Sequence, residues 1–152
     1  MAFSARLLNR FYEPAYVGDV DAPSATATAG NPTCGDVVCL EVEVVDGAIS
    51  TARFHTLGCA VAIAASDAVC ELVAGQSPMA AQFLHLDEVV GALDGIPEGR
   101  ESCASAPLAA LRAVLRNLPG GPGELGVRGP VGSGAGGPGD PGAGQIEASR
   151  TA

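Results

Sequence analysis

The amino-acid sequence predicts an α+β domain in which a small antiparallel sheet is covered by helices on one face. Three observations support this fold class. Two consecutive segments alternate between apolar and polar residues with the period of a β-strand, and a two-residue turn joins them. Helical patterns rich in alanine and valine follow the strands instead of alternating with them. Strands first and helices afterwards are typical of α+β domains.

The two clearest strands are expected over residues 37–45 and 48–57. In the first strand, valine and leucine occupy one face and two glutamates lie on the other, so one face should contact water. The pair Asp46-Gly47 between them strongly indicates a two-residue hairpin, and the strands should therefore pair antiparallel. Residues 18–30 are rich in Ala, Thr, Ser and Asp and are expected to form a loop or a poorly formed strand.

One short amphipathic helix is expected before the strands and four helices after them. The helix after Gly58 has apolar residues around almost its whole circumference, so it should be well buried. The last helix is expected to begin at Pro107, which places Cys103 a few residues before it. The predicted helices span residues 3–12, 60–73, 79–83, 87–93 and 107–118.

The C-terminal part of the chain differs in composition from the rest. The chain has 152 residues, which is enough for one domain. Residues 119–144 hold twelve of the 21 glycines and five of the eleven prolines, and they cannot bury enough apolar surface to offset their ordering entropy. We therefore expect a folded domain over residues 1–118 and a disordered Gly/Pro-rich tail over residues 119–152.

Charge and composition argue against several classes of function. The net charge is −9 and the eight basic residues are arginines scattered singly, so nucleic-acid binding is not expected. The N-terminal residues resemble no signal peptide, and the longest nearly uncharged stretch is too short to span a bilayer. A cytoplasmic protein without a membrane partner is expected. Five cysteines, an odd number, then favour free thiols or metal thiolates over disulfides.

Three cysteines are the candidate functional residues: Cys34, Cys59 and Cys103. Cys34 is followed by a glycine and by Asp36, which supplies a carboxylate two residues after the thiol. Cys59 follows Gly58 at the start of the buried helix, where the helix dipole stabilises a thiolate. Thiolates bind zinc, iron and iron–sulfur clusters well, and Asp36 could add an oxygen ligand. These residues are therefore candidates for a metal or cluster site.

Spacing alone leaves open that these cysteines are merely buried, because separations of 25 and 44 residues match no zinc-finger pattern. Cys39 lies in a strand and Cys70 on an alanine-rich helix, and both are expected to pack in the core. His55 could point toward the site, but an exposed position on its strand is preferred, and His85 is also expected to be exposed. The sequence contains no nucleophile elbow, phosphate-binding loop or dinucleotide-binding motif.

Several segments resemble the N-terminal domain of the IscU/NifU iron–sulfur scaffold family. They are NPTCGD around Cys34, LEVEVVDGAISTARFHTLGCAVAIAASD around Cys59, and a third cysteine, Cys103, near the last helix. The segment YEPAYVG at residues 12–18 is also similar to the family, and the resemblance ends at about residue 118. It implies a three-stranded antiparallel sheet with helices and three cysteines clustered at one end.

The resemblance also implies a function. Cys34, Asp36, Cys59 and Cys103 match the family's ligand positions for a transient [2Fe–2S] cluster, which is built on the protein and handed to acceptor apo-proteins. A cysteine desulfurase would provide the sulfur as a persulfide. The protein would then be a scaffold and carrier of iron and sulfur, and not an enzyme.

The chain departs from the IscU branch at two places. Ser102 stands where that branch has a histidine before the third cysteine, and residues 96–100 keep only the first proline of a segment that docks a specialised chaperone, which argues against such docking. Ser102 favours the SufU branch, whose members bind zinc through three cysteines and an aspartate and accept persulfide sulfur. Cys103 is the candidate acceptor in that case. The spacing of 44 residues, however, leaves no room for the SufU insertion, so both functions stay open.

Overall fold

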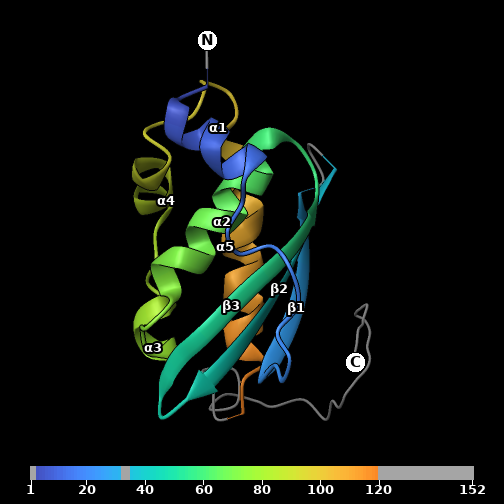
Figure 1. The fold of residues 1–152 in the computed structure, drawn as a ribbon, viewed down its shortest axis with the longest axis vertical. Helices are drawn as coiled ribbons and strands as arrows, with labels where there is room; N and C mark the ends of the chain where they lie inside the picture. Colours follow the sequence, from blue (N-terminus) through green and yellow to red (C-terminus); the bar gives the residue numbers. More distant parts are fainter. Residues whose placement is uncertain (1–2, 32–34, 120–152) are drawn as a thin grey trace.

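The sheet has three antiparallel strands in the order β1–β2–β3, formed by β1 Ala25–Asn31, β2 Asp36–Val45 and β3 Ala48–Leu57. The structure is a computed structural model and describes residues 3–31 and 35–119. Helices α2 and α5 lie side by side on one face of the sheet, with α1 and α4 packed outside them (Figure 1). The predicted α+β fold is confirmed. The helices are α1 Ala5–Tyr12, α2 Ala60–Val73, α3 Pro78–Ala81, α4 Leu86–Ala92 and α5 Glu101–Arg116.

The hairpin between β2 and β3 forms as predicted. Asp46 and Gly47 have φ angles of 54° and 79°, and two consecutive positive φ angles give a turn whose twist matches that of the strands. Glycine adopts such an angle without steric cost, and aspartate tolerates it better than most residues. The turn sets the pairing of Val44 with Ile49, and a register shift between Glu43 and Val44 then brings Leu40 opposite Phe54.

The core lies between the sheet and helices α2 and α5. Leu40 and Phe54 are almost fully buried at its centre, as is Leu111 of α5. Helix α2 is buried around most of its circumference, as its composition predicts, and it packs against β3 and α5. The buried residues of α2 are Val61, Ala62, Ala64, Ala65, Ser66, Asp67, Ala68, Val69, Cys70 and Val73.

The segment that follows α1 lies along the outer edge of β3. The Phe54 N–H donates to the Tyr16 carbonyl and the Gly18 N–H donates to the Phe54 carbonyl, both at 3.0 Å. Asp67 of α2 holds this segment, because its carboxylate accepts two backbone N–H groups of residues 15 and 16 at 2.8 and 2.9 Å. The same carboxylate pairs with Arg10 at 2.7 Å, so α1 and the edge segment are both fastened to α2.

The last helix begins earlier than predicted. Helix α5 starts at Glu101, and Pro107 lies inside it. The prediction at this boundary was wrong because the helix continues on both sides of Pro107, although a proline there removes the hydrogen bond to the carbonyl four residues earlier and crowds it. Glu101 favours this start, since an acidic residue in the first turn interacts well with the helix dipole. Ser102 and Cys103 therefore lie in the first turn of α5.

Strand β1 is regular, although its composition predicts a loop or a poorly formed strand. Pairing with β2 along its whole length and packing against α5 outweigh the weak strand propensity of its alanines and glycine. The expected tail lies outside the described residues from residue 120 onward, so its disorder and the domain boundary at residue 118 stay predictions. Within the described ranges, none of the helices has the length and apolar character needed to cross a membrane.

Candidate metal centre

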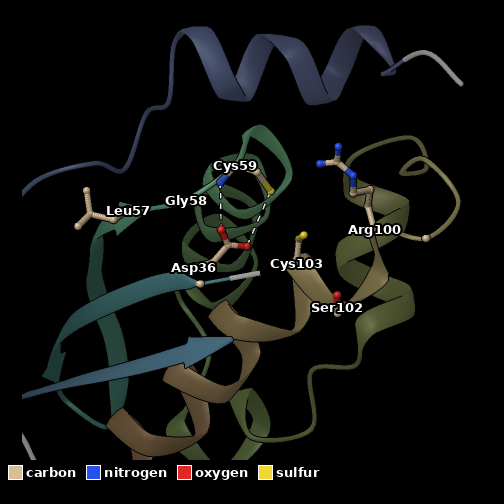
Figure 2. Close-up of a pocket in the computed structure, with 9 residues that line it drawn as sticks. Asp36, Leu57, Gly58, Cys59, Arg100, Ser102 and Cys103 are labelled. Atoms are coloured by element: carbon tan, nitrogen blue, oxygen red, sulfur yellow. Dashed lines mark hydrogen bonds between the residues drawn. The ribbon is translucent and has the colours of Figure 1, made fainter. Parts of the chain in front are cut away.

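Three of the four predicted ligand residues meet at one end of the sheet. Asp36 is the first residue of β2, Cys59 is the N-cap residue of α2, and Cys103 lies in the first turn of α5. Two sulfurs and one carboxylate oxygen from these side chains all lie within 4.8 Å of one another. Figure 2 shows the three side chains directed toward a common point. The fourth predicted ligand, Cys34, lies outside the described residues.

The Asp36 carboxylate is held in place by the junction between β3 and α2. One of its oxygens accepts the Cys59 N–H at 3.1 Å, and the other lies 3.8 Å from the Cys59 Sγ. A Cβ atom on Gly58 would lie 2.5 Å from the first oxygen, so only glycine leaves room for the carboxylate. Asp36 is 3% exposed, and its second oxygen is therefore fixed beside the sulfurs.

The two thiols lie at the N-termini of two helices. The Cys59 side chain is half-buried and Cys103 is 2% exposed. The first N–H groups of a helix point toward its N-terminus, where the helix dipole also favours negative charge. Thiolates at both positions would interact favourably with α2 and α5, so the fold places two anionic ligands where the backbone can stabilise them.

The site opens into a pocket at the protein surface. Leu57, at the end of β3, is 78% exposed at its rim, and Arg100 and Ser102 lie on the side of α5 (Figure 2). Among the described residues that line the pocket there is no histidine. The lining residues are Gly35, Asp36, Leu57, Gly58, Cys59, Gly99, Arg100, Ser102 and Cys103. The half-buried Cys59 sulfur can therefore be approached from this side, whereas Cys103 lies deeper in the site.

A buried asparagine links β1 to the helix that carries Cys103. Asn31 is the last residue of β1 and is 7% exposed, and its Nδ2 donates to the Ser102 carbonyl at 2.6 Å. Sequence reasoning does not single out Asn31, because asparagine before proline is a common turn pattern. Its role depends on a carbonyl that only the tertiary fold brings near it.

The remaining cysteines lie away from this site. Cys70 is fully buried in α2, as predicted, and burial raises the pKa of its thiol. The prediction that Cys39 packs in the core was wrong. Cys39 is half-buried on the sheet face opposite the helices, where it lies between Thr28 and His55 in the strand register. Burial raises the pKa of the Cys39 thiol as well.

Both histidines are exposed, as predicted. His55 pairs with Asp19 at 2.8 Å on the outer face of the sheet, and the side chains of this pair are 55% and 77% exposed. His85 is the N-cap residue of α4. Neither histidine lines the pocket that contains Cys59 and Cys103.

The donor set fits a thiophilic metal. In a tetrahedral zinc site each sulfur lies about 2.3 Å from the metal, so neighbouring sulfurs lie about 3.8 Å apart. The ligand atoms of Asp36, Cys59 and Cys103 lie within 4.8 Å of one another, and shifts of about 1 Å would bring them to that separation. Two thiolates and a carboxylate leave one position of a tetrahedron for a further ligand.

The fold agrees with a comparison to known protein families. The model of the NifU-like N-terminal domain matches residues 2–122, which include Asp36, Cys59 and Cys103. The chain belongs to the NifU-like N-terminal domain family. The resemblance seen in the sequence is thereby confirmed.

Relatives of this NifU-like protein include proteins named as scaffolds. The iron–sulfur cluster assembly scaffold protein IscU 1 of Archaeoglobus fulgidus is 33% identical over 113 residues, which cover 74% of each chain. The IscU scaffold protein of Escherichia coli strain K12 is 34% identical over 119 residues, which cover 76% of this chain and 92% of the relative. These matches span the described domain.

Solved structures share the fold of this NifU-like domain. A NifU-like N-terminal structure from Brucella abortus has a TM-score of 0.59 at 20% identity, covering 75% of this chain and 92% of its own. A structure from Fervidobacterium islandicum, described as a cluster assembly scaffold of the SUF system, has a TM-score of 0.63 at 17% identity, covering 74% and 95%. At these identities the likeness shows the fold alone.

Proposed function

We propose that this protein is a scaffold on which an iron–sulfur cluster is assembled and from which it passes to acceptor proteins. One observation carries the proposal: the thiols of Cys59 and Cys103 and the carboxylate of Asp36 converge within 4.8 Å at the surface of a NifU-like domain. The relatives named IscU scaffold proteins support this assignment. Iron and sulfide are then the cargo of the site.

Cys34, Asp36, Cys59 and Cys103 are the proposed ligands of a [2Fe–2S] cluster. Such a cluster takes four protein ligands, two on each iron, and is commonly held by four thiolates. Three thiolates and one carboxylate provide the same number of donors. Cys34 enters this set because it precedes Asp36 by two residues in the sequence and because a fourth donor is needed.

Asp36 suits a cluster that is handed on. A carboxylate is a harder ligand than a thiolate and binds the iron of an iron–sulfur cluster less strongly. One oxygen of Asp36 is occupied by the Cys59 N–H, which leaves the other oxygen to contact iron. The open pocket beside Leu57 allows the thiolates of an acceptor protein to replace this weaker ligand.

The sulfur donor of this proposal is a cysteine desulfurase, which presents sulfur as a persulfide on its own cysteine. Each persulfide sulfur needs two electrons to become a bridging sulfide, and these come from a separate electron donor. Delivery requires the donor cysteine to reach Cys59 or Cys103, and both line the open pocket. The protein itself then acts as a scaffold, without a catalytic residue of its own.

Anaerobic reconstitution with ferrous iron and sulfide tests the proposal. The cluster is detected by visible absorption and Mössbauer spectra in the wild type and in the variants Cys34→Ala, Cys59→Ala and Cys103→Ala. Cys39→Ala is the matched control, because Cys39 is a half-buried thiol outside the pocket. We expect cluster spectra in the wild type and the control and their loss in the three variants. Unchanged spectra in all three variants would refute the scaffold function.

A second candidate function is a zinc-dependent sulfurtransferase of the SufU kind. Ser102 favours this function. It lines the pocket, and none of the described residues that line the pocket is a histidine. Zinc bound by three thiolates and Asp36 would form a closed tetrahedral site. The Cys103 thiolate would leave the metal and attack the outer sulfur of the desulfurase persulfide. A new persulfide would then form on Cys103, and the desulfurase cysteine would leave as a thiolate.

The metal content separates the two candidates. The protein is purified without added iron, its zinc and iron are counted, and its effect on the turnover of a cysteine desulfurase is measured. One zinc per chain together with stimulation of the desulfurase supports the sulfurtransferase. A zinc-free protein that accepts a reconstituted cluster supports the scaffold.

A further inference from the structure

Two asparagines tie strand β1 to helix α5, one at each end of their contact. Asn31, at the end of β1, donates from Nδ2 to the Ser102 carbonyl in the first turn of α5 at 2.6 Å. Asn117, the C-cap residue of α5, donates from Nδ2 to the Thr26 carbonyl near the start of β1 at 2.9 Å. Only the first link lies beside the candidate metal centre. The Asn31 side chain is also buried, whereas the bond made by Asn117 is exposed.

The first turn of α5 lacks part of the support that a helix gives itself. Pro107 has no N–H, so it cannot make the helix hydrogen bond to the carbonyl of Cys103. The Cys103 N–H donates to the Arg100 carbonyl at 3.1 Å, three residues earlier, which is the tighter pattern found at helix ends. Because the first turn lacks this hydrogen bond, it depends more on contacts from other parts of the fold than the first turn of an uninterrupted helix would.

The Ser102 carbonyl receives such outside contacts. Besides the Asn31 amide, the Ser105 hydroxyl donates to it at 2.6 Å. The Asn31 bond comes from another element of the fold, whereas Ser105 belongs to α5 itself. Removing the amide donor would therefore loosen the turn relative to β1, and the Cys103 thiol would move with it.

We infer that Asn31 is a positioning residue that holds the first turn of α5 against the end of β1 and thereby keeps the Cys103 thiol beside Asp36 and Cys59. The inference rests on the proposed function in one respect, since it takes Cys103 as a ligand of the cargo. Asn31 contributes an amide donor to a backbone carbonyl, so the identity of the side chain at residue 102 does not affect this link. The link therefore functions equally with Ser102 or with a histidine at that position.

Thiol accessibility tests the inference without any metal. Asn31→Ala and Asn31→Asp both remove the amide donor, and the second keeps the shape of the side chain. Alkylation of each cysteine is followed by mass spectrometry in the native metal-free protein. Cys70 is fully buried and labels only when the whole domain opens, so it serves as an internal reference. We expect the ratio of Cys103 to Cys70 labelling to rise about three- to tenfold, as for the loss of one hydrogen bond.

Asn117→Ala is the matched control. It removes an amide-to-carbonyl bond between the same two elements at the end far from the pocket, so the labelling ratio should stay within about twofold of the wild type. In a zinc competition assay with a coloured chelator, the Asn31 variants should bind about 10- to 100-fold more weakly, as for the loss of a group that orients a ligand. Equal labelling ratios in the Asn31 and Asn117 variants would overturn the inference.

Pro107→Ala gives a second test, because it supplies a backbone N–H four residues after Cys103. With this bond available, the first turn is supported by its own helix. In a chain that carries Pro107→Ala, the Asn31→Ala change should therefore raise the ratio of Cys103 to Cys70 labelling by less than half of the rise that it causes on its own. An undiminished effect in the double variant would also overturn the inference. If the wild type binds neither zinc nor a cluster, the proposed function fails, but the labelling results still decide the role of Asn31.

Discussion

The carboxylate of Asp36 occupies the space that a side chain on Gly58 would fill. A Cβ atom at residue 58 would lie 2.5 Å from one carboxylate oxygen and 2.9 Å from the carboxyl carbon. The absence of that atom allows the same oxygen to accept the Cys59 N–H at 3.1 Å. The glycine before the second cysteine therefore determines where the carboxylate lies, and the geometry of the candidate metal centre depends on it.

Gly58→Ala should displace Asp36 and weaken metal binding. We expect the free energy of unfolding to fall by about 1–3 kcal/mol, because the added methyl group must be accommodated beside buried atoms. Zinc affinity should fall by about tenfold or more, since the carboxylate loses its orientation. Urea unfolding and chelator competition measure the two effects. Gly91→Ala is the control, because its added Cβ would have no atom within 4 Å apart from its chain neighbours and the backbone of its own helix, and it should leave zinc affinity unchanged.

Asp36→Ala should make a reconstituted cluster more resistant to chelators, if Asp36 is the weak ligand that allows release. The domain itself should lose about 1 kcal/mol of stability, because the hydrogen bond to the Cys59 N–H is removed. The half-life of the visible absorption band in excess chelator gives the resistance. A cluster lost faster than in the wild type contradicts the role given to Asp36.

Ser102→His should place an imidazole in the pocket lining next to Cys103. We expect zinc affinity to rise by about tenfold, because histidine nitrogen is a good zinc ligand and serine oxygen is a poor one. Competition titrations measure this change. Ala109→His is the control, since Ala109 is exposed on the same helix and does not line the pocket. Equal affinities for the two variants would show that residue 102 does not reach the metal.

Cys70 should make the stability of the domain sensitive to alkaline pH. Burial raises the pKa of this thiol, whereas in the unfolded chain it ionises near pH 8.5. Above that pH the folded protein holds more protons than the unfolded chain, so stability falls as pH rises, by up to about 1.4 kcal/mol per pH unit. Cys70→Ala should flatten this slope in urea unfolding between pH 8 and 10. A slope equal to that of the wild type would exclude Cys70 as its source.

Asp67→Ala should destabilise the domain by about 3 kcal/mol, because Arg10 and two backbone N–H groups lose their buried partner. Glu71 offers a matched comparison. It also pairs with Arg10, but its side chain is 52% exposed, so Glu71→Gln should cost less than about 1 kcal/mol. Thermal or urea unfolding of the two variants measures the difference. Similar losses would show that burial of Asp67 is unimportant.

Local patterns in the sequence predict most of the fold. The boundaries of β3 and α2 agree with the structure, because alternation, the Asp46-Gly47 turn and the break at Gly58 are all local signals. The start of α5 was missed, since Pro107 resembles a boundary and the residues before it carry no strong helical pattern. The face on which Cys39 lies was also missed, although the alternation in β2 places Cys39 on the same side as Glu41 and Glu43.

The candidate site is predicted less completely by local signals. Asp36 and Cys103 are brought together by the packing of α5 against the sheet. The number of residues between them in the sequence does not predict this contact. Their residue types made them candidates for one site, and the resemblance to a known family grouped them as ligands. Asn31 was missed for the same reason, because its partner is a backbone carbonyl that the fold supplies.

The buried carboxylate of Asp67 also helps to cover part of one edge of the sheet. A sheet edge with free N–H and C=O groups invites a strand from another molecule, and this leads to aggregation. Here residues 16–18 occupy the edge of β3, and Asp67 keeps them there through two backbone N–H groups. This pairing closes the β3 edge at Phe54 to a strand from another molecule, and residues 16–18 do not line the pocket.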